Sequence, residues 1–203
     1  MSNKPIIVFE GIEGSGKTLH INNVANYLKK KNQKFLRIRE PGGTSNSEKI
    51  RKIILNNKST FNKITDLLLY LSARSENIAL IKKNMKNKII LIDRFSDSTM
   101  AYQHYGMGIN KNFIEIVNNF LCKDIKVKFT FLNIVNQKNM ILRLKQRKNL
   151  NRYDKFHSSF YKRVQSGFIK ILKKNPKKYM LINSNSDISK NKNIILKQID
   201  KLI

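Results

Sequence analysis

The chain has 203 residues, a length that suits one domain, so we expect a single domain over residues 1–203. Its hydrophobic content of 40%, with only 8 glycines and 3 prolines, excludes a disordered chain, and its only cysteine, Cys122, excludes an internal disulfide bond. The 41 Lys and Arg residues against 13 Asp and Glu residues give a formal net charge of +28, which raises the question of an anionic partner.

Short apolar runs alternate with longer segments of helical periodicity along the chain. The apolar runs predict five strands, at residues 6–9, 35–38, 89–92, 126–132 and 179–182. Helices are predicted at residues 17–31, 64–85, 98–104, 111–122, 136–147, 156–174 and 187–202. One more helix is predicted to start at a capping box formed by Ser45 and Glu48. This alternation is typical of an α/β fold in which helices cover both faces of a parallel sheet.

The segment 11–18 matches the phosphate-loop pattern G-x-x-x-x-G-K-[ST] in full and lies between a predicted strand and a predicted helix. Backbone N–H groups of such a loop surround phosphates, and the N-terminus of the next helix adds partial positive charge. We therefore predict that ATP is bound by Gly11, Ile12, Glu13, Gly14, Ser15, Gly16, Lys17 and Thr18. Lys17 is the expected catalytic cation at the β- and γ-phosphates, and the Thr18 hydroxyl is an expected Mg²⁺ ligand.

The apolar run at 89–92 is followed directly by Asp93 and Arg94. Because parallel sheets bind ligands at the carboxyl ends of their strands, Asp93 should lie near the phosphate loop and act on Mg²⁺, directly or through water. The Arg94 guanidinium should meet an acceptor phosphate close to the γ-phosphate of ATP. Asp93 and Arg94 are both predicted to be catalytic, and Arg51 and Arg39 are further candidates for holding the acceptor phosphate.

Three further segments and the glutamate-bearing phosphate loop together resemble the thymidylate kinase family. The segments are REPGGT at 39–44, the stretch 68–74 with Tyr70 and Arg74, and the run 93–103. Their order and spacing fit that family over nearly the whole chain. The resemblance implies a P-loop nucleoside-monophosphate-kinase fold with a mobile lid, and transfer of the γ-phosphoryl group of ATP to dTMP with Mg²⁺. It also implies a homodimer that buries apolar faces of the long helices.

The resemblance also assigns the residues of a dTMP pocket. Tyr70 and Arg74 are four residues apart and share one helix face; in the family, the first position is usually a Phe that stacks on thymine, and the second hydrogen-bonds its carbonyl edge. An acid at the position of Glu13 accepts a hydrogen bond from the 3′-hydroxyl, although Glu13 could instead pair with a cation of the acceptor site. The predicted dTMP-binding set is Glu13, Arg39, Arg51, Tyr70, Arg74, Arg94, Ser98, Thr99, Tyr102 and Gln103.

A basic segment at about 143–155 resembles the lid of the Escherichia coli-like subgroup of this family. That subgroup has arginines in the lid and none in the phosphate loop, and here Gly14 stands where another branch has Arg. Arg147 and Arg152 match basic positions of that lid and are predicted to be catalytic cations. Asp154 replaces a family Glu, and Asn151 replaces a frequent Asp, so the resemblance leaves the lid contacts undefined.

Two other interpretations stay open at this point. A different P-loop nucleotide or nucleoside kinase would share the loop, but a nucleoside kinase would need a base where the arginines stand. A basic nucleic-acid-binding NTPase would use the positive charge, but the lysines are scattered along the chain, which favours compositional drift. No apolar stretch reaches the roughly 18 residues of a membrane span, so we expect a cytoplasmic protein with no membrane partner and no specific nucleic-acid partner.

Overall fold

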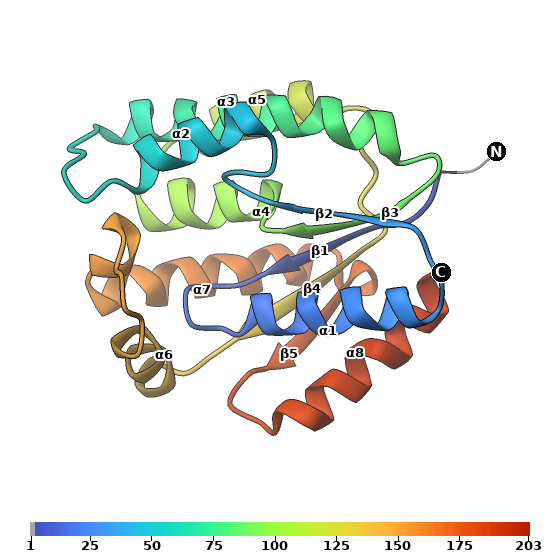
Figure 1. The fold of residues 1–203 in the computed structure, drawn as a ribbon. Helices are drawn as coiled ribbons and strands as arrows, with labels where there is room; N and C mark the ends of the chain where they lie inside the picture. The colour runs from blue at the N-terminus through green and yellow to red at the C-terminus, as the bar shows by residue number, and fades with distance from the viewer. Residues whose placement is uncertain (1–2) are drawn as a thin grey trace.

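Five short strands form a parallel sheet at the centre of the fold (Figure 1). The structure is a computed structural model that describes residues 3–203. The strands are β1 (Ile6–Glu10), β2 (Phe35–Arg39), β3 (Ile89–Asp93), β4 (Phe129–Ile134) and β5 (Tyr179–Asn183), in the spatial order β2-β3-β1-β4-β5. All neighbouring strands run parallel, so the predicted five-stranded parallel sheet is confirmed. β4 begins later than predicted because its pairing with β1 starts at Phe129, opposite Ile7.

Helices cover both faces of the sheet, as the alternation predicts. On one face α1 and α8 lie side by side (Figure 1), and buried Ile21 and Ile195 pack against Phe9. On the other face, Ile81 of α3 packs against Ile90. The elements are α1 (Lys17–Lys30), α2 (Ser45–Leu55), α3 (Lys63–Asn84), α4 (Ser96–Thr99), the π-helix η1 (Met100–Gly106), α5 (Lys111–Cys122), α6 (Gln137–Lys145), the 3₁₀ turns η2 (Arg152–Lys155) and η3 (Pro176–Lys178), α7 (Ser158–Lys174) and α8 (Ile188–Leu202). Within residues 3–203, no helix is both long enough and apolar enough to span a bilayer.

The start of α2 differs from the predicted capping box. Thr44 is the N-cap residue, and its hydroxyl accepts a hydrogen bond from the N–H of Ser47 at 3.1 Å. Ser45 is therefore already helical, and Glu48 accepts instead from the N–H of Gly43 at 2.9 Å. The box prediction is wrong because the chain enters the helix one residue earlier than the pattern indicates.

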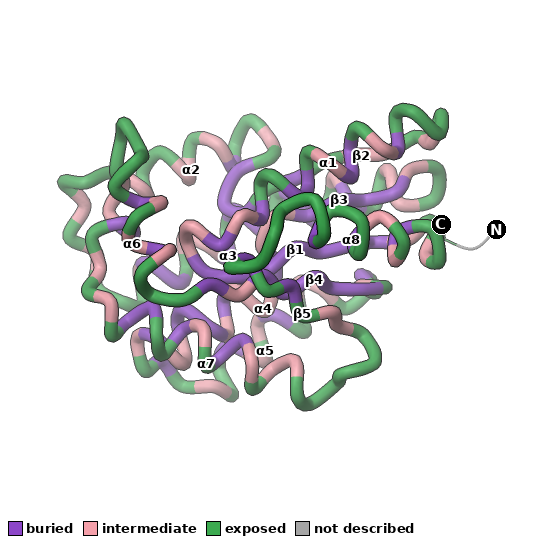
Figure 2. The backbone as a smooth tube through the Cα atoms, turned by 90° about the horizontal axis from the view of Figure 1, so that it is seen from below, coloured by how far each residue is buried: buried purple, intermediate pink, exposed green. Residues whose placement is uncertain are grey.

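The strand ends place the loops that follow them at one edge of the sheet. Phe9 and Arg39 both pair with Asp93, so β1, β2 and β3 end at the same level. Figure 2 shows that the buried backbone follows the central strands, while exposed backbone lies on the outer helices and loops. The phosphate loop and the turn after Asp93 are therefore held by rigid, buried strands, which is what a precise binding site requires.

Candidate active site

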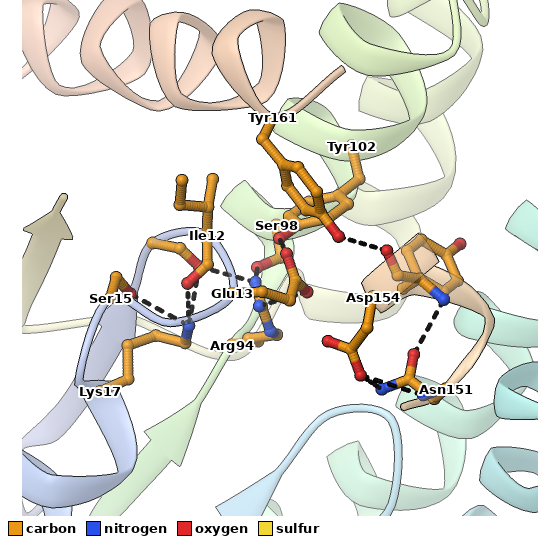
Figure 3. Close-up of polar contacts among 12 residues, drawn as sticks. Ile12, Glu13, Ser15, Lys17, Arg94, Ser98, Tyr102, Asn151, Asp154 and Tyr161 are labelled. Atoms are coloured by element: carbon orange, nitrogen blue, oxygen red, sulfur yellow. Dashed lines mark hydrogen bonds and ion pairs between the residues drawn. The ribbon is translucent and has the colours of Figure 1, made fainter. Parts of the chain in front are cut away.

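The phosphate loop joins β1 to α1 and encloses the side chain of Lys17. Gly11 has φ +136°, and a Cβ there would collide with the carbonyl oxygen of Asn133, so only glycine fits. The Lys17 ammonium donates hydrogen bonds to the carbonyl oxygens of Gly11 (2.8 Å) and Ile12 (2.9 Å) and contacts Ser15 (Figure 3). Burial lowers the pKa of Lys17 to about 8. The loop thus holds one buried cation where phosphates would bind.

The hydroxyl of Thr18 lies next to the carboxylate of Asp93. Thr18 Oγ1 donates to Asp93 Oδ2 across 3.4 Å, although the two residues are far apart in the sequence. Mg²⁺ prefers oxygen ligands and in nucleotide sites takes only one or two from the protein, with water and phosphate oxygens completing its shell. The pair fits that donor set, whereas no group of three or more His, Cys, Asp and Glu side chains among residues 3–203 is arranged for a metal.

Arg94 connects the phosphate loop to the turn after β3. Its backbone has φ +68°, a left-handed conformation that non-glycine residues rarely adopt. Its guanidinium donates to the carbonyl oxygen of Gly11 and to Oε1 of Glu13, each at 2.8 Å, and Oε2 of Glu13 accepts from the Tyr102 hydroxyl at 2.5 Å (Figure 3). Burial opposes its charge, yet the pKa of Arg94 is raised because Tyr102, Glu13 and Asp93 surround it. Arg94 therefore stays cationic.

One cavity of about 230 Å³ lies between the phosphate loop, β3, α3 and the basic segment after α6. It brings together nearly all the side chains that the sequence predicts for catalysis and for dTMP. Those that line it are Glu13, Lys17, Thr18, Arg39, Arg51, Tyr70, Arg74, Asp93, Arg94, Ser98, Thr99, Tyr102, Gln103 and Arg147. The cavity therefore combines a cationic end at the phosphate loop with a partly aromatic end at α3 and η1.

The predicted dTMP-binding arginines Arg39, Arg51 and Arg74 have different partners. Arg51 donates to the carbonyl oxygen of Pro41 at 2.6 Å, and burial together with nearby Arg39 lowers its pKa. Arg39 is half exposed and pairs with Glu48 at 3.0 Å. Arg74 and Glu40 are both buried and form an ion pair at 2.8 Å. Because Glu40 compensates its charge, we expect Arg74 to act on a ligand through directed hydrogen bonds more than through net charge.

The two predicted lid arginines point in different directions. Arg147 lines the cavity, and its guanidinium lies 2.5 Å from Oδ1 of Asp154. Asp154 is buried and accepts from the backbone N–H of Asn151 at 3.0 Å, so the two residues that depart from the family pattern hold each other (Figure 3). Arg152 instead pairs with buried Asp66 of α3, outside the cavity lining. The expectation of a catalytic cation at Arg152 stays a prediction that this arrangement does not support.

Comparison with known proteins agrees with this fold. A protein-family model described as thymidylate kinase matches residues 9–195. The chain belongs to the thymidylate kinase family. A thymidylate kinase from Thermosipho africanus is 40% identical over 169 residues, covering 82% of this chain and 84% of that protein. One from Sulfurihydrogenibium sp. is 37% identical, covering 94% of each chain.

A solved structure of a thymidylate kinase has the same fold as this chain. The crystal structure of thymidylate kinase from Ehrlichia chaffeensis matches with a TM-score of 0.78 and 32% sequence identity, over 98% of this chain and 99% of that chain. Because the match covers nearly all of both chains, the two proteins share the whole fold and not only the phosphate loop. The predicted P-loop fold is therefore confirmed.

Glu10 is a site residue that reasoning from thymidylate kinase motifs missed. It ends β1, is fully buried, and accepts hydrogen bonds from the N–H of Phe95 (2.8 Å) and from the N–H and hydroxyl of Ser98. These bonds hold the turn that carries Arg94 in its left-handed conformation. Burial and nearby Asp97 raise the pKa of Glu10 to about 8, against the hydrogen bonds that lower it. The only signal in the sequence was a carboxylate at the end of an apolar strand, which needs buried donors.

Tyr153 is the second residue that was missed. It lies in the basic segment, is 2% exposed, and lines the cavity beside Tyr70. The two rings meet edge to face with their centroids 5.7 Å apart. No thymidylate kinase motif indicated it, and its one sequence signal was an aromatic residue inside a charged segment.

Proposed function

We propose that this chain transfers the γ-phosphoryl group of ATP to the phosphate of dTMP, giving ADP and dTDP. The observation that carries the proposal is the Arg94–Glu13 ion pair, at 2.8 Å, which lies between the phosphate loop and the aromatic end of the cavity. An acceptor phosphate held by Arg94 would meet a γ-phosphate held by Lys17. Membership of the thymidylate kinase family supports the same reaction.

The chemistry needs alignment and neutralisation of charge more than covalent help. An oxygen of the dTMP phosphate forms the new bond to the γ-phosphorus while the bond to the ADP oxygen breaks. That oxygen is already anionic, so no general base is required. Lys17, Arg94 and Arg147 supply the positive charge around the transferring group. Mg²⁺, held by Thr18 and Asp93, would neutralise phosphate charge when bound.

The aromatic end of the cavity fits the nucleobase. We assign the Tyr70 ring to the face of thymine, and the buried polar groups of Thr99 and Gln103 to its edge. Arg74, fixed by Glu40, can offer a hydrogen bond to a base carbonyl. Tyr102 borders the sugar position, and Ser98 is held by Glu10. Arg51 and Arg39 assist Arg94 at the acceptor phosphate.

The arginine distribution supports a subgroup assignment as part of the same proposal. The phosphate loop has Gly14 and no arginine, and Arg147 of the basic lid faces the cavity. We therefore place the chain with the Escherichia coli-like thymidylate kinases, in which the lid supplies the cation. A cytoplasmic location follows from the proposed substrates, ATP and dTMP.

The proposed reaction is tested by measuring ADP formation with a set of acceptors. The enzyme, with MgATP, should phosphorylate dTMP far faster than dCMP or dGMP, because cytosine has an amino group where thymine has a carbonyl oxygen and guanine is larger than the ring assigned to this space; dUMP, which shares thymine's polar edge, measures the contribution of the 5-methyl group. Thymidine should be inert, since it lacks the phosphate that Arg94 would hold. Equal rates on all monophosphates, activity on thymidine alone, or DNA-stimulated ATP hydrolysis without transfer would each refute the proposal.

Glu13 is predicted to serve the acceptor rather than ATP. Replacing Glu13 by Gln removes the charge that pairs with Arg94 and accepts from Tyr102. We expect kcat/KM for dTMP to fall about 10- to 100-fold, the usual effect of losing a charge-assisted hydrogen bond. ADP affinity, measured by calorimetry, should stay close to that of the wild type. A large loss of ATP affinity with unchanged dTMP affinity would show that Glu13 acts in ATP binding instead.

A homodimer is the expected assembly. Exposed apolar side chains lie on the packed pair α3 and α5: Leu68 is 48% exposed, Ile116 is 68% exposed and Phe120 is 79% exposed. A second copy of this chain would cover them, as the family resemblance implies. Light scattering should give a dimer for the wild type and a monomer for the double variant Ile116→Asp/Phe120→Asp. The control Ile188→Asp, at an exposed site on α8, should stay dimeric; a dimer in both variants would place the interface elsewhere.

A further inference from the structure

A buried carboxylate of α3 receives two hydrogen bonds from the lid. Asp66 lies in the first turn of α3 and is 1% exposed. Its Oδ1 accepts from the Arg152 guanidinium, and its Oδ2 accepts from the Tyr153 hydroxyl. A buried carboxylate is stable only with such donors, and these two come from one lid turn, so Asp66 ties the lid to α3.

Arg152 is enclosed by the helices on which the lid rests. Its Nε donates to the carbonyl oxygen of Ile54 in α2 at 3.1 Å. Its guanidinium also lies over the rings of Phe61 (5.6 Å) and Tyr153 (5.2 Å). The contacts outside the lid are with Ile54 of α2, with Phe61 just before α3 and with Asp66 of α3, so Arg152 acts in this structure as an attachment point of the lid rather than as a cation of the cavity.

Tyr153 connects the attachment to the base end of the cavity. Its ring packs edge to face on Tyr70 and lies 6.0 Å, centroid to centroid, from Tyr102. Gln103 Nε2 lies 3.5 Å from its hydroxyl, and the Tyr161 hydroxyl donates to its backbone carbonyl oxygen. The position of the ring therefore defines one wall of the space proposed for thymine.

The same turn fixes the lid cation. Asp154 follows Tyr153 directly, is buried, and holds Arg147 at 2.5 Å. Asn151 closes the turn through its capping contacts with Asp154. A shift of Tyr153 and Arg152 would therefore move Asp154 and the Arg147 guanidinium with it.

We propose that Asp66 is a positioning residue that sets the lid for both substrates. Through Tyr153 it fixes the wall of the base site, and through the adjoining turn it aims Arg147 at the phosphates. Catalysis is sensitive to such placement, since a displacement of about 1 Å can cost roughly 100-fold in rate. This inference rests on the proposed function, because it assigns Tyr153 to the dTMP site and Arg147 to the transferring group.

The contact is tested with the variants Asp66→Asn, Tyr153→Phe and both together. Each single variant should raise KM for dTMP and lower kcat, reducing kcat/KM about 10- to 100-fold. ADP affinity should be unchanged, because the phosphate loop is untouched and Arg147 is assigned to the transferring γ-phosphoryl group, which ADP lacks. The double variant should be no worse than the more impaired single variant, because the Tyr153–Asp66 contact that Tyr153→Phe removes is one that Asp66→Asn already weakens. Glu76→Gln, an exposed acid on the same helix, is the matched control and should behave as wild type.

Trypsin provides a readout that does not depend on the reaction. The lid carries exposed Lys145 and Lys148, and loss of the Asp66 contact should speed cleavage there several-fold in the absence of nucleotides. Wild-type kinetics with wild-type cleavage in Tyr153→Phe, or additive losses in the double variant, would overturn the inference. If Asp66→Asn fails to fold, Tyr153→Phe alone tests the contact between Asp66 and the lid. If the wild-type enzyme does not use dTMP, the proposed function is wrong, but the rate of trypsin cleavage still tests whether Asp66 holds the lid.

Discussion

Replacing Arg94 by Ala should lower kcat/KM for dTMP by about 10³-fold, the upper range for removing one preorganised donor from a transferring charge. Arg94 is the only arginine that contacts both the phosphate loop, at Gly11, and the acceptor-side acid Glu13 among the hydrogen bonds of residues 3–203. Its removal would leave the acceptor phosphate unaligned and the Glu13 carboxylate unpaired. Steady-state kinetics with dTMP varied at saturating MgATP measures the loss.

Arg94→Lys is the matched variant for this prediction. It keeps a positive charge but loses the planar fork that reaches Gly11 and Glu13 together, so its activity should lie between those of wild type and Arg94→Ala. Circular dichroism and ADP affinity should be preserved in both variants if the fold and the phosphate loop are intact. A loss below tenfold in Arg94→Ala would exclude Arg94 from the acceptor site.

Replacing Lys17 by Met should reduce kcat/KM for ATP by about 10³-fold, because the variant removes the cation that the loop encloses. The Lys17 ammonium lies within the loop, where it donates to the carbonyl oxygens of Gly11 and Ile12. Methionine keeps the length and apolar stem of the side chain, so folding should be retained. Binding of dTMP, measured by calorimetry, should be nearly unchanged; a parallel loss of dTMP affinity would contradict the assignment.

The same residue predicts how ATP use depends on pH. Burial and the neighbouring Arg94 lower the pKa of Lys17 to about 8 in the free enzyme, against the opposing effect of Asp93 and Glu13. Above that pH the ammonium loses its proton, so kcat/KM for ATP should decline as the pH rises through 8 and beyond. Arg in place of Lys17 stays protonated and should remove this decline. A decline that persists in Lys17→Arg would contradict the assignment to Lys17.

The sequence alone determined the parts of this protein that depend on local pattern. The phosphate loop is recognisable because its signals are local: the glycine spacing, the strand before it and the helix after it all lie within one βα unit. Asp93 and Arg94 could be placed beside that loop because an apolar strand ending in a charged pair must, in a parallel sheet, end at the same edge. Helical spacing likewise placed Tyr70 on one face with Arg74, whereas its assignment to the base came from the family resemblance.

Only the tertiary structure decided which partners these side chains take. Glu10 receives its donors from residues 95 and 98, Arg74 is neutralised by Glu40, and Asp66 draws Arg152 away from the cavity while Arg147 stays in it. Nothing in the basic segment distinguishes Arg147 from Arg152, because both carry the same charge. The distinction arises because a buried carboxylate must be paired, and packing of α3 against the lid brings Asp66 to Arg152 rather than to Arg147.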